Sequence, residues 1–219
     1  GCPFGCSYCL SSVEKKVRLR SLEKVYGELQ FFLDNRVKQV KFVDRTFNMD
    51  IRHSKGILKY ILEHDNGVTN FHFEIGGDLL TEEEIGLMSG MRPGLLQLEI
   101  GVQSVNPRTI TAIHRQMNLK KLKDNVLAIK SFHNIHQHLD LIAGLPYEDA
   151  ASFAKSFDEV YALQPEKLQL GFLKILKGAP VSLETGSYGI RHISRPPYEV
   201  METRWMTFDD LCRLKRVEE

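Results

Sequence analysis

NFHFEIGG (residues 70–77) is the stretch that decides the fold. Apolar and polar residues alternate along it, which is typical of a β-strand whose two faces meet different surroundings, with the phenylalanines opposite His72 and Glu74. The same alternation returns in LLQLEIGVQS (95–104) and IHQHLDLIAG (135–144). Three similar strands therefore form the centre of the predicted sheet.

Helical patterns separate these strands from one another and from two further ones. The predicted helices are 21–36, 53–67, 81–91, 106–115, 119–134 and 149–164, and the further strands are 37–44 and 167–176. Strands about 30 residues apart with helices between them predict βαβ units, an α/β fold and a parallel sheet of five strands. Right-handed crossovers of one sense curl such a sheet into a barrel or an arc.

One face of the predicted sheet carries polar residues in three successive strands. They are His72, Glu74, Gln97, Glu99, Gln103, His136, His138 and Asp140. A parallel strand that is buried on both faces should be almost entirely apolar. The pattern favours a polar, functional cavity on this face over the alternative of a bare solvent face.

Composition excludes several classes of protein. The 219 residues carry a net charge of +1 with 26% charged residues, so no strong field marks a nucleic-acid or membrane-surface binder. No apolar run reaches the length of a membrane span. Few, unevenly spaced cysteines predict a reducing, cytoplasmic location rather than a disulfide framework.

The weaker pattern near the end of the chain predicts a division into two parts. Residues 1–176 form the expected partial barrel core, and 177–219 an irregular and helical extension in which 201–219 is helical. Trp205, Phe208 and Leu211 are expected on one face of that helix.

The opening GCPFGCSYCL places Cys2, Cys6 and Cys9 within eight residues, and Cys212 lies far away. A closed zinc site needs four ligands, whereas a [4Fe–4S] cluster on three thiolates keeps one iron open for an outside ligand. If Cys212 were a fourth ligand, the site would instead be a metal-stapled structural or electron-transfer domain.

CPFGCSYC (2–9) resembles the C-x3-C-x-aromatic-C signature of radical S-adenosylmethionine (radical SAM) enzymes. EIGVQSVNP (99–107) and HLDLIAGLPYED (138–149) are similar to strands of the branch that holds coproporphyrinogen III dehydrogenase, the methylthiotransferases and cobalamin-binding members. KFVDRTFNMD (41–50) and the late LGFLKILKGAPV (170–181) resemble the cobalamin-binding group. The resemblance implies a partial (β/α)6 TIM-like barrel whose first strand is expected to precede this chain, as in an excised segment of a longer protein.

The resemblance also implies site residues. Cys2, Cys6 and Cys9 match the ligands of the [4Fe–4S] cluster. The residues implied to bind SAM are Tyr8, Asp44, Arg45, Thr46, Glu74, Gln103, Asp140, Ile142, Gly144 and Leu145. Among them Tyr8 matches the aromatic beside the adenine, and Gln103 and Asp140 match positions near the ribose. Two interpretations of Arg115 stay open: a cation at the end of a helix, or a partner for the SAM carboxylate.

The implied reaction is reductive cleavage of SAM to a 5′-deoxyadenosyl radical, with a small-molecule substrate that the sequence does not name. An external flavodoxin- or ferredoxin-type electron donor is implied, and no membrane or nucleic-acid partner is expected. Cobalamin is expected only through a domain outside this chain. Two other enzyme classes stay open, a tRNA methylthiotransferase and a porphyrinogen oxidase. Leu10 counts against the oxidase, because the motif of that family carries a further cysteine soon after the third one.

Overall fold

The computed structural model describes residues 1–218. Its helices are α1 (Leu22–Asp34), α2 (Ile51–Glu63), α3 (Glu82–Ser89), α4 (Pro107–Ala112), α5 (Leu119–Lys130), α6 (Ala150–Tyr161) and α7 (Phe208–Glu218). Its strands are β1 (Gln39–Lys41), β2 (Asn70–Ile75), β3 (Leu96–Gln103), β4 (His136–Ala143), β5 (Lys167–Phe172), β6 (Arg191–His192) and β7 (Val200–Glu202). Short 3-10 turns are η1 (Leu10–Ser12), η2 (Phe47–Met49), η3 (Gly77–Leu79) and η4 (Pro180–Leu183).

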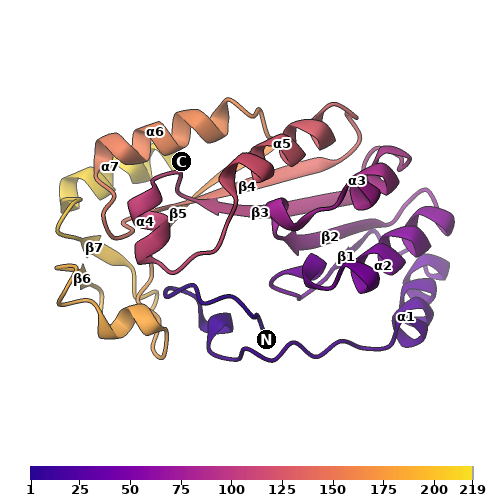
Figure 1. Cartoon of the computed structure of the whole chain (residues 1–219), viewed down its shortest axis with the longest axis horizontal. Helices are drawn as coiled ribbons and strands as arrows, with labels where there is room; N and C mark the ends of the chain where they lie inside the picture. The colour runs from indigo at the N-terminus through magenta and orange to yellow at the C-terminus, as the bar shows by residue number, and fades with distance from the viewer. Residues whose placement is uncertain (219) are drawn as a thin grey trace.

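Strands β1 to β5 form one parallel sheet in the order of the chain. Each crossover between neighbouring strands carries a helix, which is the arrangement of a (β/α) barrel. The sheet is an open arc with β1 and β5 at its edges (Figure 1). The prediction of an α/β partial barrel with five parallel strands is therefore confirmed.

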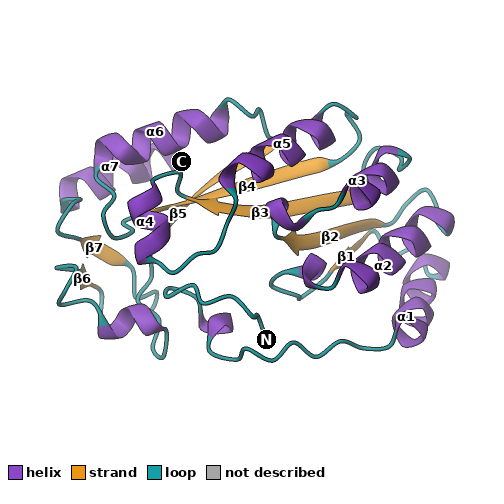
Figure 2. Ribbon diagram, in the orientation of Figure 1, coloured by secondary structure: helices purple, strands orange, loops and turns teal. Residues whose placement is uncertain are grey.

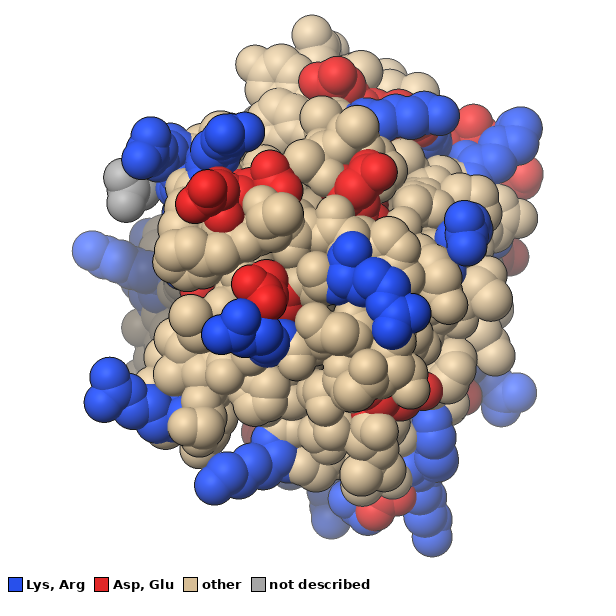
Figure 3. Space-filling view, turned by 90° about the vertical axis from the view of Figure 1, so that its left-hand side faces the viewer, with Lys and Arg blue, Asp and Glu red and all other residues tan. Residues whose placement is uncertain are grey.

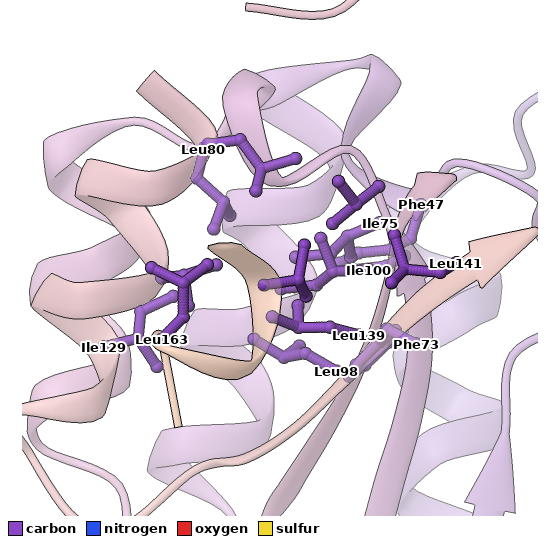
Figure 4. Packing of buried hydrophobic residues seen from close by; sticks show 14 of the residues in the cluster. Phe47, Phe73, Ile75, Leu80, Leu98, Ile100, Ile129, Leu139, Leu141 and Leu163 are labelled. Atoms are coloured by element: carbon purple, nitrogen blue, oxygen red, sulfur yellow. The ribbon is translucent and has the colours of Figure 1, made fainter. Parts of the chain in front are cut away.

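The apolar face of this sheet is the core of the protein. Ile75, Ile100 and Leu139 are register partners on three adjacent strands, and each is buried (Figure 4). Helix residues such as Ile57 and Val126 belong to the same buried cluster. Because side chains alternate along a strand, burying this face turns the polar residues of β2, β3 and β4 to the opposite side of the sheet.

The helices begin at polar caps that the sequence contains. The Thr81 hydroxyl accepts from the backbone N–H of Glu84, and the Glu84 carboxylate accepts from the backbone N–H of Thr81, which is a capping box. Asn106 caps α4, with Pro107 at its first position. The Ser21 side chain, in contrast, makes no capping bond to α1. The two caps fix where α3 and α4 begin.

The C-terminal part differs from the helix predicted for 201–219. Residues Val200–Glu202 pair as β7 with β6, and α7 begins only at Phe208. The physical reason is a turn in which the Thr203 hydroxyl accepts from the N–H groups of Trp205 and Met206. Trp205 therefore lies outside the helix, and the predicted common face with Phe208 and Leu211 is wrong.

The N-terminal loop lies at the carboxyl ends of the strands, on the side toward which the arrows in Figure 2 point. Backbone bonds anchor it to distant segments: Ser7 N–H donates to the carbonyl of Ile113, and Val181 N–H donates to the carbonyl of Ser7. Among the described residues, no helix has the length and apolar character that crossing a membrane requires.

Candidate functional site

The three clustered cysteines face a cavity of about 440 Å³ at the carboxyl ends of the strands. The opposite wall is built by strand-end side chains of the polar sheet face, among them Glu74 from β2, Gln103 from β3 and Asp140 from β4. A cavity of this size is typical of a small-molecule site, and the carboxyl ends of parallel strands are where barrel enzymes place their chemistry. The predicted polar cavity is present on the predicted face.

The cysteine loop is held on both sides of this cavity. Cys2 N–H donates to the carbonyl of Glu14 at 2.9 Å, and Cys2 Sγ lies 3.8 Å from Thr46 Oγ1 in the loop after β1. Ser12 closes the other end, because its hydroxyl donates to the carbonyl of Cys9 at 2.6 Å. Cys2 and Cys6 are buried, and Cys9 is half-buried. The loop is thus held both by backbone hydrogen bonds and by side-chain contacts.

The cysteine geometry bears on which group could bind. Within residues 1–218, no three His, Cys, Asp or Glu side chains converge on a point where a single metal ion could bind. In a [4Fe–4S] cluster each thiolate ligates a different iron, so the sulfurs stand farther apart than the ligands of one ion. Three free cysteines around one cavity, with Cys212 on α7 and outside its lining, fit a cluster with one open iron.

Arg115 lies beside this loop. Its Nη2 donates to the carbonyl of Gly101 at 2.5 Å, while its Nη1 is 3.4 Å from the Tyr8 hydroxyl and 3.9 Å from Cys6 Sγ. The Nε atom is buried without a partner. Burial holds the pKa of the Tyr8 hydroxyl well above its usual value, although the positive charge of Arg115 acts the other way. Arg115 therefore offers a buried cation and a free donor to the cavity.

Gln103 stands at an irregular point of β3. The register between β3 and β4 shifts after Gly101, and Gln103 has a φ of +72°, in the left-handed region that a glutamine rarely adopts. Its side-chain Oε1 is buried without a hydrogen-bond partner. A Cβ on Gly101 would lie 2.3 Å from Gln103 Nε2, so the glycine makes room for this side chain.

A chain of charges continues from the cavity along the polar face. Lys41 Nζ lies 3.2 Å from Glu99 and 3.7 Å from Glu74, and Arg45 lies 3.2 Å from Glu74. His72 Nε2 is 3.0 Å from Glu99. Burial alone would raise the pKa of Glu99, but the hydrogen bond and charge of Lys41 outweigh it and lower that pKa. Glu99 is thus an anion at neutral pH.

Asp140 extends the site toward β5. Its Oδ1 is buried and 3.1 Å from His138 Nε2, at an angle that does not form a hydrogen bond, so both atoms are unpartnered. Together with Tyr8 and Gln103, Asp140 also lines a second cavity of about 300 Å³, in which Ile142 lies. The two cavities share a wall, and their unpartnered polar atoms offer hydrogen bonds to a bound molecule.

The structure brings together most of the residues that the sequence predicts. One cavity is lined by Cys2, Cys6, Tyr8, Cys9, Arg45, Thr46, Glu74, Gln103 and Asp140. Asp44 instead lines a separate groove at the β1 edge. Gly144 and Leu145 lie outside the linings of both cavities. Gly144 faces Leu211 and Val200 instead, and Leu145 is fully buried. Arg115 is the cavity residue that sequence reasoning left open.

The comparisons with known proteins agree with this geometry. Residues 1–160 match the Radical SAM superfamily, and residues 186–219 match a protein family of unknown function, DUF4080. The chain is 26% identical over 218 residues to the cobalamin-dependent radical SAM methyltransferase TokK of Streptomyces tokunonensis, covering 90% of this chain and 30% of that protein.

Solved structures show the same fold. The radical SAM methyltransferase TsrM of Kitasatospora setae, with cobalamin and a [4Fe–4S] cluster bound, superposes with a TM-score of 0.75 at 17% identity, over 90% of this chain and 41% of that one. Coproporphyrinogen III oxidase of Escherichia coli gives a TM-score of 0.64 at 15% identity, over 97% and 48%.

The chain belongs to the radical SAM superfamily. Its relatives lie in the branch that holds cobalamin-dependent methyltransferases and coproporphyrinogen III oxidase, as the sequence motifs predict. Membership implies a [4Fe–4S] cluster and SAM, and the three free cysteines and unpartnered polar atoms fit them. The chain spans 36% and 30% of the length of the first two curated relatives it matches.

Proposed function

We propose that this chain is the core of a radical SAM enzyme in which Cys2, Cys6 and Cys9 hold the cluster and the adjoining cavity holds SAM. The observation that carries the proposal is the shared cavity, in which the cysteines face unpartnered polar atoms of Gln103, Asp140 and Arg115. When bound, the cluster supplies the electron that cleaves SAM reductively and starts radical chemistry on a small-molecule substrate.

The residues around the cavity have distinct proposed tasks. The Arg115 guanidinium is placed to bind the SAM carboxylate, since it has a free buried donor beside the cysteine loop. Tyr8 supplies a ring for the adenine, and Gln103 and Asp140 supply hydrogen bonds for the ribose. Thr46, Arg45 and Glu74 stand on the side of Cys2, where the methionine end of SAM would lie. Ile142 adds an apolar wall in the second cavity.

Three residues predicted to bind SAM lie outside both cavities. Asp44 would reach SAM only if the loop after β1 turned inward from its groove. Gly144 and Leu145 would act through the backbone at the end of β4, where Gly144 has a φ of +83°. The proposed division remains a core of residues 1–176 and an extension of residues 177–219.

The test is anaerobic reconstitution with iron and sulfide, with cysteine variants compared by iron content and absorbance. We expect C2A, C6A and C9A each to lose the cluster, and the matched control C212A to keep it. SAM should then change the electron paramagnetic resonance spectrum of the reduced wild-type cluster. Loss of the cluster in C212A as complete as in C6A would overturn the proposal, because the fourth iron would already be ligated.

Methyl transfer with cobalamin is the favoured reaction of the whole protein. Two observations support it: TokK is named a cobalamin-dependent methyltransferase, and TsrM is a methyltransferase solved with cobalamin bound. Transfer of a labelled methyl group from SAM to cobalamin by the full-length protein would test it. A protein that releases 5′-deoxyadenosine but never methylates cobalamin would instead point to the oxidase-like alternative.

The proposed partners are a small substrate and a flavodoxin- or ferredoxin-type electron donor, in the cytoplasm. The four free thiols are compatible with a reducing compartment. On the face seen in Figure 3, basic and acidic side chains are interspersed. Such a mixed face favours a protein or small-molecule partner over nucleic acid.

A further inference from the structure

A buried acidic residue lies just outside the proposed SAM cavity. Glu148, in the loop after β4, has no solvent exposure, and Ser104 after β3 and Ser156 on α6 are equally buried. The Ser104 hydroxyl donates to Glu148 Oε1 at 2.5 Å, and the Ser156 hydroxyl donates to the same oxygen at 3.1 Å. Glu148 Oε2 is buried without a partner. The proposed function assigns no task to this carboxyl.

The contacts of Glu148 join two loops that follow neighbouring strands. Ser104 Oγ also accepts from the N–H of Asn106 at 3.0 Å, and the Asn106 amide donates to the carbonyl of Tyr147 at 2.9 Å. Ser156 Oγ accepts from the N–H of Val105 at 3.1 Å. The backbone from Ser104 to Asn106 is therefore held through Glu148 and its hydroxyl partners.

This held segment directly follows Gln103. A glutamine in the left-handed region is strained and persists only where its surroundings impose that conformation. Gln103 has a φ of +72°, and its buried Oε1 in the cavity is unpartnered. Fixing the next residue, Ser104, fixes the carbonyl side of Gln103 and with it the direction in which its side chain leaves β3.

We propose that Glu148 is a positioning residue that ties the loop after β4 to the end of β3 and thereby holds Gln103 against the ligand. The inference rests on the proposed function, in which Gln103 contacts SAM. Glu148 itself touches no ligand, because it lines neither cavity.

Only a neutral Glu148 suits this task. Burial raises its pKa to about 7, with the two serine hydroxyls lowering it less and the charge of Asp149 adding to the rise. Asp149 is the charged group that acts on it among the described residues, and its own carboxylate caps α6 by accepting from Ser152 N–H at 2.8 Å. The side chains that hydrogen-bond to Glu148 are the two serine hydroxyls. Within residues 1–218 no cation pairs with Glu148, so its ionised form favours opening of the loop toward water.

The test measures SAM affinity of the cluster-loaded protein at about pH 6 and about pH 8.5, on either side of this titration. We expect the wild type to bind SAM about tenfold more weakly at the higher pH. E148Q, which accepts the same two hydrogen bonds and cannot ionise, should lose that part of the pH dependence. E148A should bind weakly at both values. Any pH effect shared by the wild type and E148Q comes from SAM or the cluster.

A control and a second readout separate the possible failures. E159Q, on α6 where Glu159 pairs with Lys123 of α5, should keep the wild-type pH profile. The infrared band of a protonated carboxyl should be present in the wild type at about pH 6 and absent in E148Q. E148Q with the wild-type pH dependence, or E148A with wild-type affinity, would overturn the positioning role. A cluster-loaded wild type that shows the infrared band but binds no SAM at either pH would overturn the proposed function itself.

Discussion

Arg115 Nη1 lies 3.9 Å from Cys6 Sγ although 109 positions separate the two residues. The contact arises because the chain returns to the cysteine loop after α4, where the Ile113 carbonyl accepts a hydrogen bond from the backbone N–H of Ser7. A fixed positive charge beside a thiolate stabilises its negative charge, and a cluster ligated there takes up an electron more readily.

Replacing Arg115 should separate its two tasks. R115Q removes the charge, so we expect a cluster of normal iron content with a more negative reduction potential and SAM affinity at least about tenfold weaker. R115K keeps the charge but loses the fork of donors, so the potential should stay near the wild type while SAM affinity falls. Potentiometric titration and equilibrium binding measure the two. R108Q, which alters an exposed arginine over the Tyr147 ring, is the control. An unchanged potential in R115Q would contradict the electrostatic role.

A methyl group on Gly101 should displace the Gln103 side chain. An alanine Cβ would lie 2.3 Å from Gln103 Nε2, so that amide would have to move, whereas at 3.4 Å from Arg115 Nη2 it would make an ordinary contact. We expect G101A to fold and to bind the cluster but to lose SAM affinity. G86A is the matched control, because nothing lies within 4 Å of its added methyl group on the exposed side of α3, and it should raise the free energy of unfolding by about 0.5–1 kcal/mol. Normal SAM binding by G101A would show that the position of the Gln103 amide beside Gly101 is not needed for SAM binding.

The central strands could be predicted from the sequence because their burial follows a local rule. In β3, buried and half-buried residues alternate without a break, since one face packs on helices and the other faces the cavity. The edge strand was predicted over 37–44 but spans only Gln39–Lys41, the residues that pair with β2. Thr207, whose hydroxyl donates to Asp210 at 2.7 Å, is a cap signal that could have placed the start of α7.

The site was predictable only where a motif is local. The cysteine spacing is visible in eight residues, and the polar strand ends follow from alternation. Neither the left-handed conformation of Gln103 nor the approach of Arg115 to the cysteine loop is encoded by a short pattern, because Arg115 reaches the loop only through the tertiary fold. For the same reason Gly144 and Leu145, which match a family motif, lie away from the cavities in this structure.

Glu148 should also make stability depend on pH. Its pKa rises from 4.5 in the unfolded chain to about 7 in the folded protein, so the folded state retains the proton longer. The stabilisation is complete below about pH 4.5, falls as the pH rises through the folded pKa and levels off above it, with a total of about 3 kcal/mol. Urea unfolding at several pH values should show this fall in the wild type relative to E148Q. Parallel pH profiles of the two proteins would contradict the raised pKa.

Lys41 should control the ionisation of His72. Burial lowers the pKa of His72 first, Lys41 lowers it further, and Glu99 acts in the opposite direction. K41M removes the repulsion and leaves Glu99 as an anion 3.0 Å from His72, so we expect the pKa of His72 to rise in an NMR titration. A histidine whose pKa is lower in the folded protein than the unfolded value near 6.5 makes the protein less stable as the pH falls below that value. K41M should therefore also lessen the loss of stability below about pH 6.5. K59M, at an exposed helical pair with Glu63, should leave His72 unchanged. A His72 pKa that stays the same in K41M would contradict the proposed effect of Lys41 on His72.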